Sequence, residues 1–218
     1  MAKGKDSLTR VLLMSGVLSG ILFIGVSLIL SFVVPGFDIT RQPISVLLLG
    51  NFGWIQMVNF ELSGALALLF AVGMWRLLHP GKGGTWGPIL VGLYGLGIVI
   101  AGLFYPDPEF GFPPGAPLGE PTAMSMHGSI HGFAFFGLVL AIIAVSIVFA
   151  RRFASIKQKG WKTYCIATAI GAPFLLILGI ILSGATGRGA LPLLGVGVVT
   201  SAWISLIANH LLKSPQQN

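Results

Sequence analysis

Long, uninterrupted runs of apolar residues make up most of the chain. Crossing a bilayer as a helix takes about 20 such residues, and six runs reach that length: residues 11–34, 53–78, 85–105, 127–150, 163–184 and 191–212. A transmembrane barrel would show segments of about ten residues in which polar and apolar positions alternate, whereas these runs are apolar on every side. The pattern predicts an all-α membrane protein, a single domain built as a bundle of six transmembrane helices.

Composition supports this class of protein. Of the 218 residues, 55% are hydrophobic and 9% are charged, which is too little charge to cover the surface of a water-soluble domain. The formal net charge of +7 does not indicate nucleic-acid binding, because the basic residues are scattered over short loops without interleaved aromatic residues. Membrane lipids are therefore the expected partners.

Lysine and arginine are divided unequally between the two sides of the predicted bundle. With a cytoplasmic N-terminus, the outer loops (35–52, 106–126 and 185–190) hold only Arg41 and Arg188 of the 13 basic residues. The positive-inside rule then predicts that both termini are cytoplasmic. The first apolar run is too long for a cleaved signal peptide. The absence of a eukaryotic targeting signal favours a prokaryotic cell membrane.

The second apolar run carries polar side chains at membrane depth. Gln56, Asn59 and Ser63 share one helix face, whereas Glu61 points away from it. A charged carboxyl at this depth costs about 2.5 to 3.5 kcal/mol on insertion scales. Glu61 is therefore expected to be protonated, paired or placed in a wet cavity. Two interpretations stay open, namely proton-coupled transport through Glu61 and an uncharged Glu61 bonded to a neighbouring helix.

The richest group of ionisable residues lies at the start of the fourth run. His127 and His131 are four residues apart, so on a helix they share one face and can hold one metal ion. Asp107 is the candidate third ligand or base, and Ser45 could assist hydrolysis. Other carboxylate donors predicted on the same side are Asp38, Glu109 and Glu120. Two hypotheses follow: a metal-dependent intramembrane lipid hydrolase with zinc as the candidate cofactor, and a structural or pH-responsive polar network.

A non-enzymatic function needs no complete catalytic set, and we favour it slightly. In this hypothesis an outward-facing polar pocket, formed by outer loops and the adjacent helix ends, binds, senses or moves a lipid or a small hydrophobic molecule. Its expected lining comprises Ser45, Gln56, Asn59, Glu61, Asp107, His127, His131 and Arg188. Metal content would separate this hypothesis from the hydrolase.

Several short motifs along the chain resemble one family. They are Phe37-Asp38, Arg41-Gln42-Pro43-Ile44-Ser45, Gly53-Trp54-Ile55-Gln56, Asn59-Phe60, Pro106-Asp107, His127-Gly128 with His131, and Gly187-Arg188. Together they are similar to the domain-of-unknown-function 998 family of six-helix membrane proteins. The resemblance implies this topology and marks the same polar residues without giving them roles. A looser likeness to seven-helix ceramidase and adiponectin-receptor type hydrolases implies zinc held by three histidines, of which this chain lacks an outer third.

Overall fold

The computed structural model describes residues 6–214. Its helices are α1 (Ser7–Val33), the short 3-10 helix η1 (Ile44–Leu49), α2 (Gly53–Leu78), α3 (Trp86–Leu103), α4 (Met126–Ser155), α5 (Lys159–Thr186) and α6 (Ala190–Lys213). All six α-helices are long and apolar enough to span a membrane, and no strand occurs within the described range. The predicted all-α fold with six membrane-spanning helices is confirmed.

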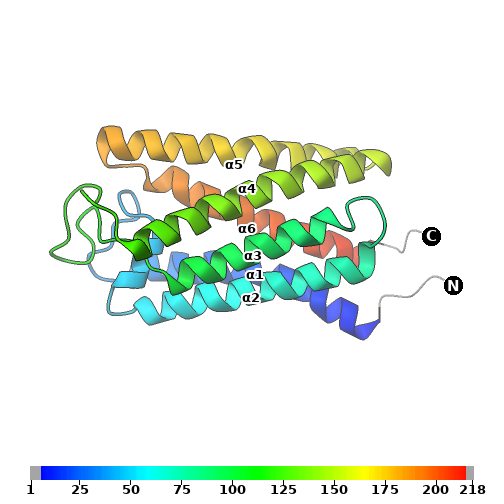
Figure 1. Ribbon diagram of the computed structural model, residues 1–218, viewed down its shortest axis with the longest axis horizontal. Coiled ribbons are helices and arrows are strands. Elements are labelled where there is room, and N and C mark those ends of the chain that lie inside the picture. Colours follow the sequence, from blue (N-terminus) through cyan, green and yellow to red (C-terminus); the bar gives the residue numbers. More distant parts are fainter. Residues whose placement is uncertain (1–5, 215–218) are drawn as a thin grey trace.

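The six α-helices lie side by side and close into a ring. Each packs against the next along the chain, and α6 packs against α1. Figure 1 shows all of them running along the long axis of the molecule. We call one end of the bundle the loop end, which consists of residues 34–52, 104–125 and 187–189. The opposite end, with residues 79–85, 156–158, the start of α1 and the end of α6, is the terminal end.

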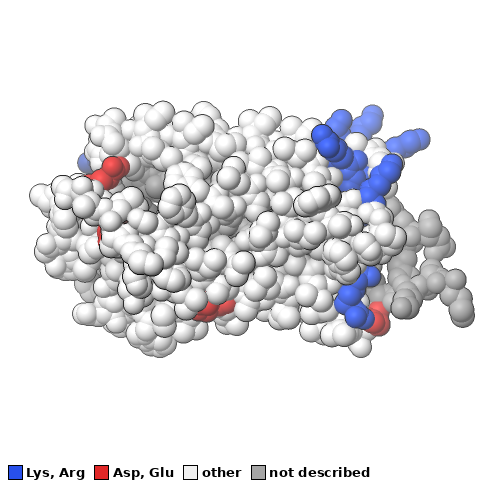
Figure 2. Space-filling view, in the orientation of Figure 1, with Lys and Arg blue, Asp and Glu red and all other residues white. Residues whose placement is uncertain are grey.

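Basic side chains are concentrated at one end of the bundle. Figure 2 shows most of the visible Lys and Arg side chains gathered at the terminal end. There the Asp6 carboxylate accepts a hydrogen bond from Thr9 N (2.7 Å), which caps α1, and pairs with Arg76 (2.8 Å). The hydrogen bonds from Thr9 hold the pKa of Asp6 below its ordinary value. Lys3 and Lys5, which contribute to the predicted charge asymmetry, lie outside the described residues.

Large side chains fill the ring toward the terminal end. Phe70, Phe149 and Trp203 are fully buried, and the Phe149 and Trp203 rings meet edge to face at 5.5 Å. These residues lie past the midpoints of α2, α4 and α6, counted from the loop end. Toward the loop end, the bundle instead encloses a cavity.

Candidate functional site

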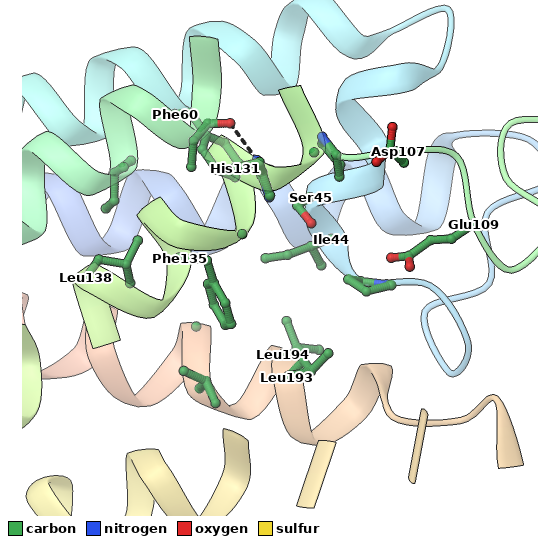
Figure 3. Close-up of a pocket in the computed structure, with 18 of the residues that line it drawn as sticks. Ile44, Ser45, Phe60, Asp107, Glu109, His131, Phe135, Leu138, Leu193 and Leu194 are labelled. Carbon is green, nitrogen blue, oxygen red and sulfur yellow. Dashed lines mark hydrogen bonds between the residues drawn. The ribbon is translucent and has the colours of Figure 1, made fainter. Parts of the chain in front are cut away.

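A cavity of about 350 Å³ lies within the ring at the loop end. Figure 3 shows side chains from several helices turned toward it, and Figure 2 shows the surface hollowed beside an acidic side chain at this end. Every α-helix except α5 contributes to the lining, together with η1 and the loop between α3 and α4. Most of the wall is apolar or aromatic and includes Phe23, Ile44, Phe60, Tyr94, Ile98, Phe135, Leu138, Leu193 and Leu194.

Three of the predicted pocket residues line this cavity, namely Ser45, Asp107 and His131. Glu109 and Glu120, which the sequence offered only as alternative metal donors, line it as well. The structure places the other five predicted residues elsewhere: Gln56, Asn59, Glu61, His127 and Arg188. The cavity is therefore more apolar than the polar pocket expected from the sequence, with its charged groups confined to the loop end.

His131 joins the start of α4 to the end of α3. Its Nδ1 lies 2.9 Å from both the Ala101 and the Phe104 carbonyl oxygens, in the last turn of α3 and just after it. Figure 3 shows one hydrogen bond from the His131 ring as a dashed line. Carbonyl oxygens only accept hydrogen bonds, so Nδ1 carries a proton and donates. These bonds satisfy carbonyls that a helix end leaves without partners. In a neutral ring, Nε2 keeps its lone pair and is an acceptor.

His127 has different surroundings from His131. Its side chain is exposed, and its ring packs against Phe104 (5.2 Å) and Tyr105 (5.3 Å). Among residues 6–214, no group of three His, Cys, Asp or Glu side chains could hold a metal ion. The predicted zinc ligands His127, His131 and Asp107 therefore do not gather into a set of three donors here, and zinc binding stays a prediction.

Asp107 stabilises the first turn of α4. Its Oδ2 accepts a hydrogen bond from Ser125 N (2.9 Å), and the Ser125 side chain caps the helix by accepting from Gly128 N (3.0 Å). The carboxylate also occupies the space where a side chain at Gly128 would lie. A negative charge is favourable beside a helix N-terminus. Asp107 thus has a structural role at the rim of the cavity.

Glu109 is the most perturbed carboxyl of the loop end. Burial, together with the negative charges of Glu120 and Asp107, raises the pKa of Glu109 to about 7. Both effects disfavour the ionised carboxylate. Three acidic groups consequently share one side of the cavity, and one of them titrates near neutral pH.

The loop that carries these acids is held in place by residues around η1. Phe112 is buried, and its ring packs edge to face on Phe37 (5.5 Å) and lies close to Gly50. The Gln42 side chain donates a hydrogen bond to the Phe110 carbonyl (2.8 Å). The two long loops of the loop end therefore form one packed unit over the cavity.

The Gln56 and Asn59 side chains join α2 to α1 and η1 by hydrogen bonds. Asn59 Nδ2 donates to the Phe23 carbonyl (3.1 Å) and to Ser27 Oγ (3.2 Å) on α1. Gln56 Nε2 donates to Ser27 Oγ (3.0 Å) and to the Ile44 carbonyl of η1 (3.1 Å). This polar face of α2 is thus engaged by α1 and η1, and it fixes η1 against the bundle.

Glu61 and Arg188 also lie apart from the cavity. The Glu61 side chain is half-buried, covers Gly102 of α3, and has no hydrogen-bond partner for its Oε1 among the described residues. Arg188 is exposed near Asp38. Hydrogen bonds from Thr40, and to a lesser degree the charges of Arg41 and Arg188, hold the pKa of Asp38 below its ordinary value. Proton transport through Glu61 stays a prediction.

The two histidines should contribute unequally to stability. Replacing His131 by alanine leaves two α3 carbonyls without their donor, and we expect a loss of about 1 to 3 kcal/mol in the free energy of unfolding. His127→Ala removes only exposed ring contacts and should cost well under about 1 kcal/mol. Thermal unfolding of both variants in detergent, followed by circular dichroism, compares them. Equal losses would contradict the capping role of His131.

Comparison with known proteins gives one match. No curated protein and no solved structure matches the chain. The model of the family described as "Protein of unknown function (DUF998)" matches residues 17–210, from within α1 to near the end of α6. The resemblance inferred from the short motifs is thereby confirmed, and the match extends over nearly the whole bundle. The chain belongs to the DUF998 family, as a multi-pass membrane protein with six apolar helices.

Proposed function

We propose that this protein binds a lipid or another small hydrophobic molecule in the cavity at the loop end. The cavity itself carries the proposal. Its volume falls within the range of about 300 to 1,000 Å³ that is usual for small-molecule sites, which are mostly apolar with a few polar groups. A molecule with an apolar tail would bury that tail between Phe23, Phe60 and Phe135.

In this proposal the loop end faces the outside of a prokaryotic cell membrane. The positive-inside rule supports that orientation, because the terminal end holds most of the described basic residues: Arg10, Arg76, Lys82, Arg151, Arg152, Lys157, Lys159, Lys162 and Lys213. The cavity would then receive its ligand from the outer leaflet or from the space outside the membrane.

Cysteine labelling in intact cells tests the orientation. Cys165 is the sole cysteine and is fully buried, so an introduced cysteine provides the signal. Arg188→Cys at the loop end should react with a membrane-impermeant maleimide, whereas Lys159→Cys at the terminal end should react only after the cells are opened. The reverse pattern would place the loop end in the cytoplasm.

A matched pair of glycine variants tests the occupancy of the cavity. Gly132 lines the cavity, and a Cβ there would have Met124 Cε as its nearest neighbour at 3.8 Å, so a larger side chain can enter the space. Gly137 is exposed on the same helix with nothing within 4 Å. Gly132→Leu should therefore reduce the cavity volume, whereas Gly137→Leu leaves it unchanged.

Native mass spectrometry of protein released from micelles reads out the result. We expect an additional bound mass on the wild type and on Gly137→Leu, and its loss from Gly132→Leu. Because both substitutions replace a helical glycine, any general gain in helix stability is shared between them. An absent mass in every variant, or equal masses in all three, would overturn the proposed function.

A further inference from the structure

We propose that the molecule held in this cavity carries a positively charged amine head, bound by the loop-end carboxylates and His131, with its apolar tail among the aromatic residues of the wall. This inference rests on the proposed function and specifies the class of ligand. It is carried by the hydrogen-bonding character of the groups that line the cavity.

The charged side chains of the lining have one sign. Asp107, Glu109 and Glu120 line the cavity, and neither lysine nor arginine is found among the described lining residues. Arg188 lies near Asp38 instead. A carboxylate or phosphate head would therefore meet like charges with no nearby basic partner, which disfavours such ligands.

His131 adds a hydrogen-bond acceptor to the same lining. The side chain is only 8% exposed and belongs to the cavity wall. Nδ1 is engaged as a donor to Ala101 and Phe104, so Nε2 is the nitrogen left for a ligand, and no described residue bonds to it. Because Nε2 is an acceptor, a ligand group that bonds to it must be a donor. An ammonium group supplies up to three donors and no acceptor.

The state of Glu109 supports a cationic ligand. Its pKa of about 7 reflects burial and the neighbouring charges of Glu120 and Asp107, and a bound cation would offset both effects. Affinity for an amine should therefore increase as the pH rises through about 7 and Glu109 ionises. An alkylamine resembles a lysine side chain, whose pKa is about 10.4, so the ligand itself stays charged over that range.

The depth of the cavity determines the expected length of the apolar tail of the ligand. On α4 the lining extends from Gly128 to Leu138, which is about 15 Å at 1.5 Å per residue. A single extended alkyl chain of about twelve carbons fits such a depth. We therefore choose dodecyl probes that share one photoreactive diazirine tail and differ in the head, which is an amine, an alcohol or a carboxylate.

The experiment measures crosslinking in proteoliposomes at pH 8.0 and pH 5.5. Mass spectrometry gives the ratio of label on the cavity residues Phe135 and Leu193 to label on Ile177 and Ile181, which are exposed on α5. This ratio corrects for the partition of each probe into the bilayer. We expect roughly a tenfold higher ratio for the amine than for the carboxylate at pH 8.0, because charge-assisted hydrogen bonds are strong, and a lower amine ratio at pH 5.5.

Carboxyl variants identify the groups responsible. Glu109→Gln should reduce the amine ratio and weaken its pH dependence, although the titratable groups His131, Asp107 and Glu120 remain in the lining. Glu120→Gln changes an exposed side chain and should reduce the ratio less. Glu61→Gln is the matched control, since Glu61 is a carboxyl outside the cavity, and it should behave as the wild type.

The outcomes separate this inference from the proposed function. Equal cavity labelling by all three probes would overturn the amine head and leave hydrophobic binding intact. Cavity labelling no higher than on α5 for every probe would overturn both. A photoreactive phosphatidylethanolamine carries a phosphate beside its amine, so it should label the cavity less than the dodecylamine probe. Stronger labelling by the phosphatidylethanolamine would make a membrane lipid the source of the amine head and contradict the exclusion of phosphate.

Discussion

Replacing Gly20 by leucine should prevent stable folding, whereas the same change at Gly25 should be tolerated. Gly20 lies at a close approach of α1 and α6, and a Cβ there would clash with the Ser201 carbonyl oxygen and with Ser205 Oγ. A Cβ at Gly25 on the same helix meets nothing within 4 Å. Small residues at such crossings allow membrane helices to approach closely.

The expected loss at Gly20 exceeds that of ordinary overpacking, which is about 1 to 3 kcal/mol. A backbone oxygen cannot move aside as a flexible side chain can, so α6 itself would have to shift. Both substitutions gain helix propensity, which is worth up to about 1 kcal/mol. Gly25→Leu should therefore be as stable as the wild type or slightly more so. Size-exclusion chromatography of detergent extracts after heating measures the difference, and similar melting of the two variants would contradict this account.

The α1–α6 contact matters for the site because it closes the ring. Phe23 of α1 and Leu193 and Leu194 of α6 form one side of the cavity wall. The Ser205 hydroxyl reinforces the same contact by donating to the Val17 carbonyl (2.9 Å). The candidate binding site therefore depends on this contact between the first and last helices, because its loss would open the ring around the cavity.

The six helices could be predicted because the bilayer imposes their length. Each span needs its own apolar run whatever its neighbours are. The ends were less predictable: α1 begins at Ser7 and α5 at Lys159, before the apolar runs that start at residues 11 and 163. Polar residues at the membrane edge continue a helix without contributing to a hydropathy signal. Asp6, for example, extends α1 by capping it.

The polar face of α2 was predicted correctly as a face, but its partner was not visible in the sequence. Gln56, Asn59 and Ser63 are all buried. The sequence suggested that Gln56 and Asn59 line a pocket, yet they bond to Ser27 of α1 and to the backbone of α1 and η1. A face that bonds to a neighbouring helix and a face that binds a ligand have the same spacing, so only the helix arrangement distinguishes them.

The loop-end cluster shows a second limit of the same kind. Asp107 and His131 were singled out for chemistry, and both lie at the cavity, but each also holds a helix end through backbone atoms. A hydrogen bond from a side chain to a backbone atom cannot be predicted from the sequence pattern, because every residue other than proline has the same backbone groups. Glu109 gains its unusual pKa from burial beneath a folded loop. Its proximity to Asp107 and Glu120 along the chain was the only signal that could have identified it.

Raising the pH through the range from about 4.5 to about 7 should loosen the loop of residues 104–125. The pKa of Glu109 is about 7 in the folded loop, and its ordinary value is 4.5. Below 4.5 the carboxyl is protonated whether the loop is folded or open, so folding carries no penalty. Between the two values the folded loop binds more protons than the open loop, and stability falls as the pH rises. Above 7 the penalty is complete, at most about 3 kcal/mol.

Hydrogen–deuterium exchange of this loop at pH 5.5 and pH 8.0, corrected for the intrinsic rate at each pH, measures the effect. The wild-type loop should be better protected at pH 5.5, and Glu109→Gln should be equally protected at both values because glutamine does not ionise. Glu120→Gln removes one of the charges that raise the pKa of Glu109 in the folded loop, so its loss of protection should be smaller and complete at a lower pH. Asp38 does not titrate in this range, since its pKa lies below its ordinary value of 3.8. A wild-type loop protected equally at both pH values would show that Glu109 is not held in a buried, acidic environment, and this would also remove one support for a cationic ligand.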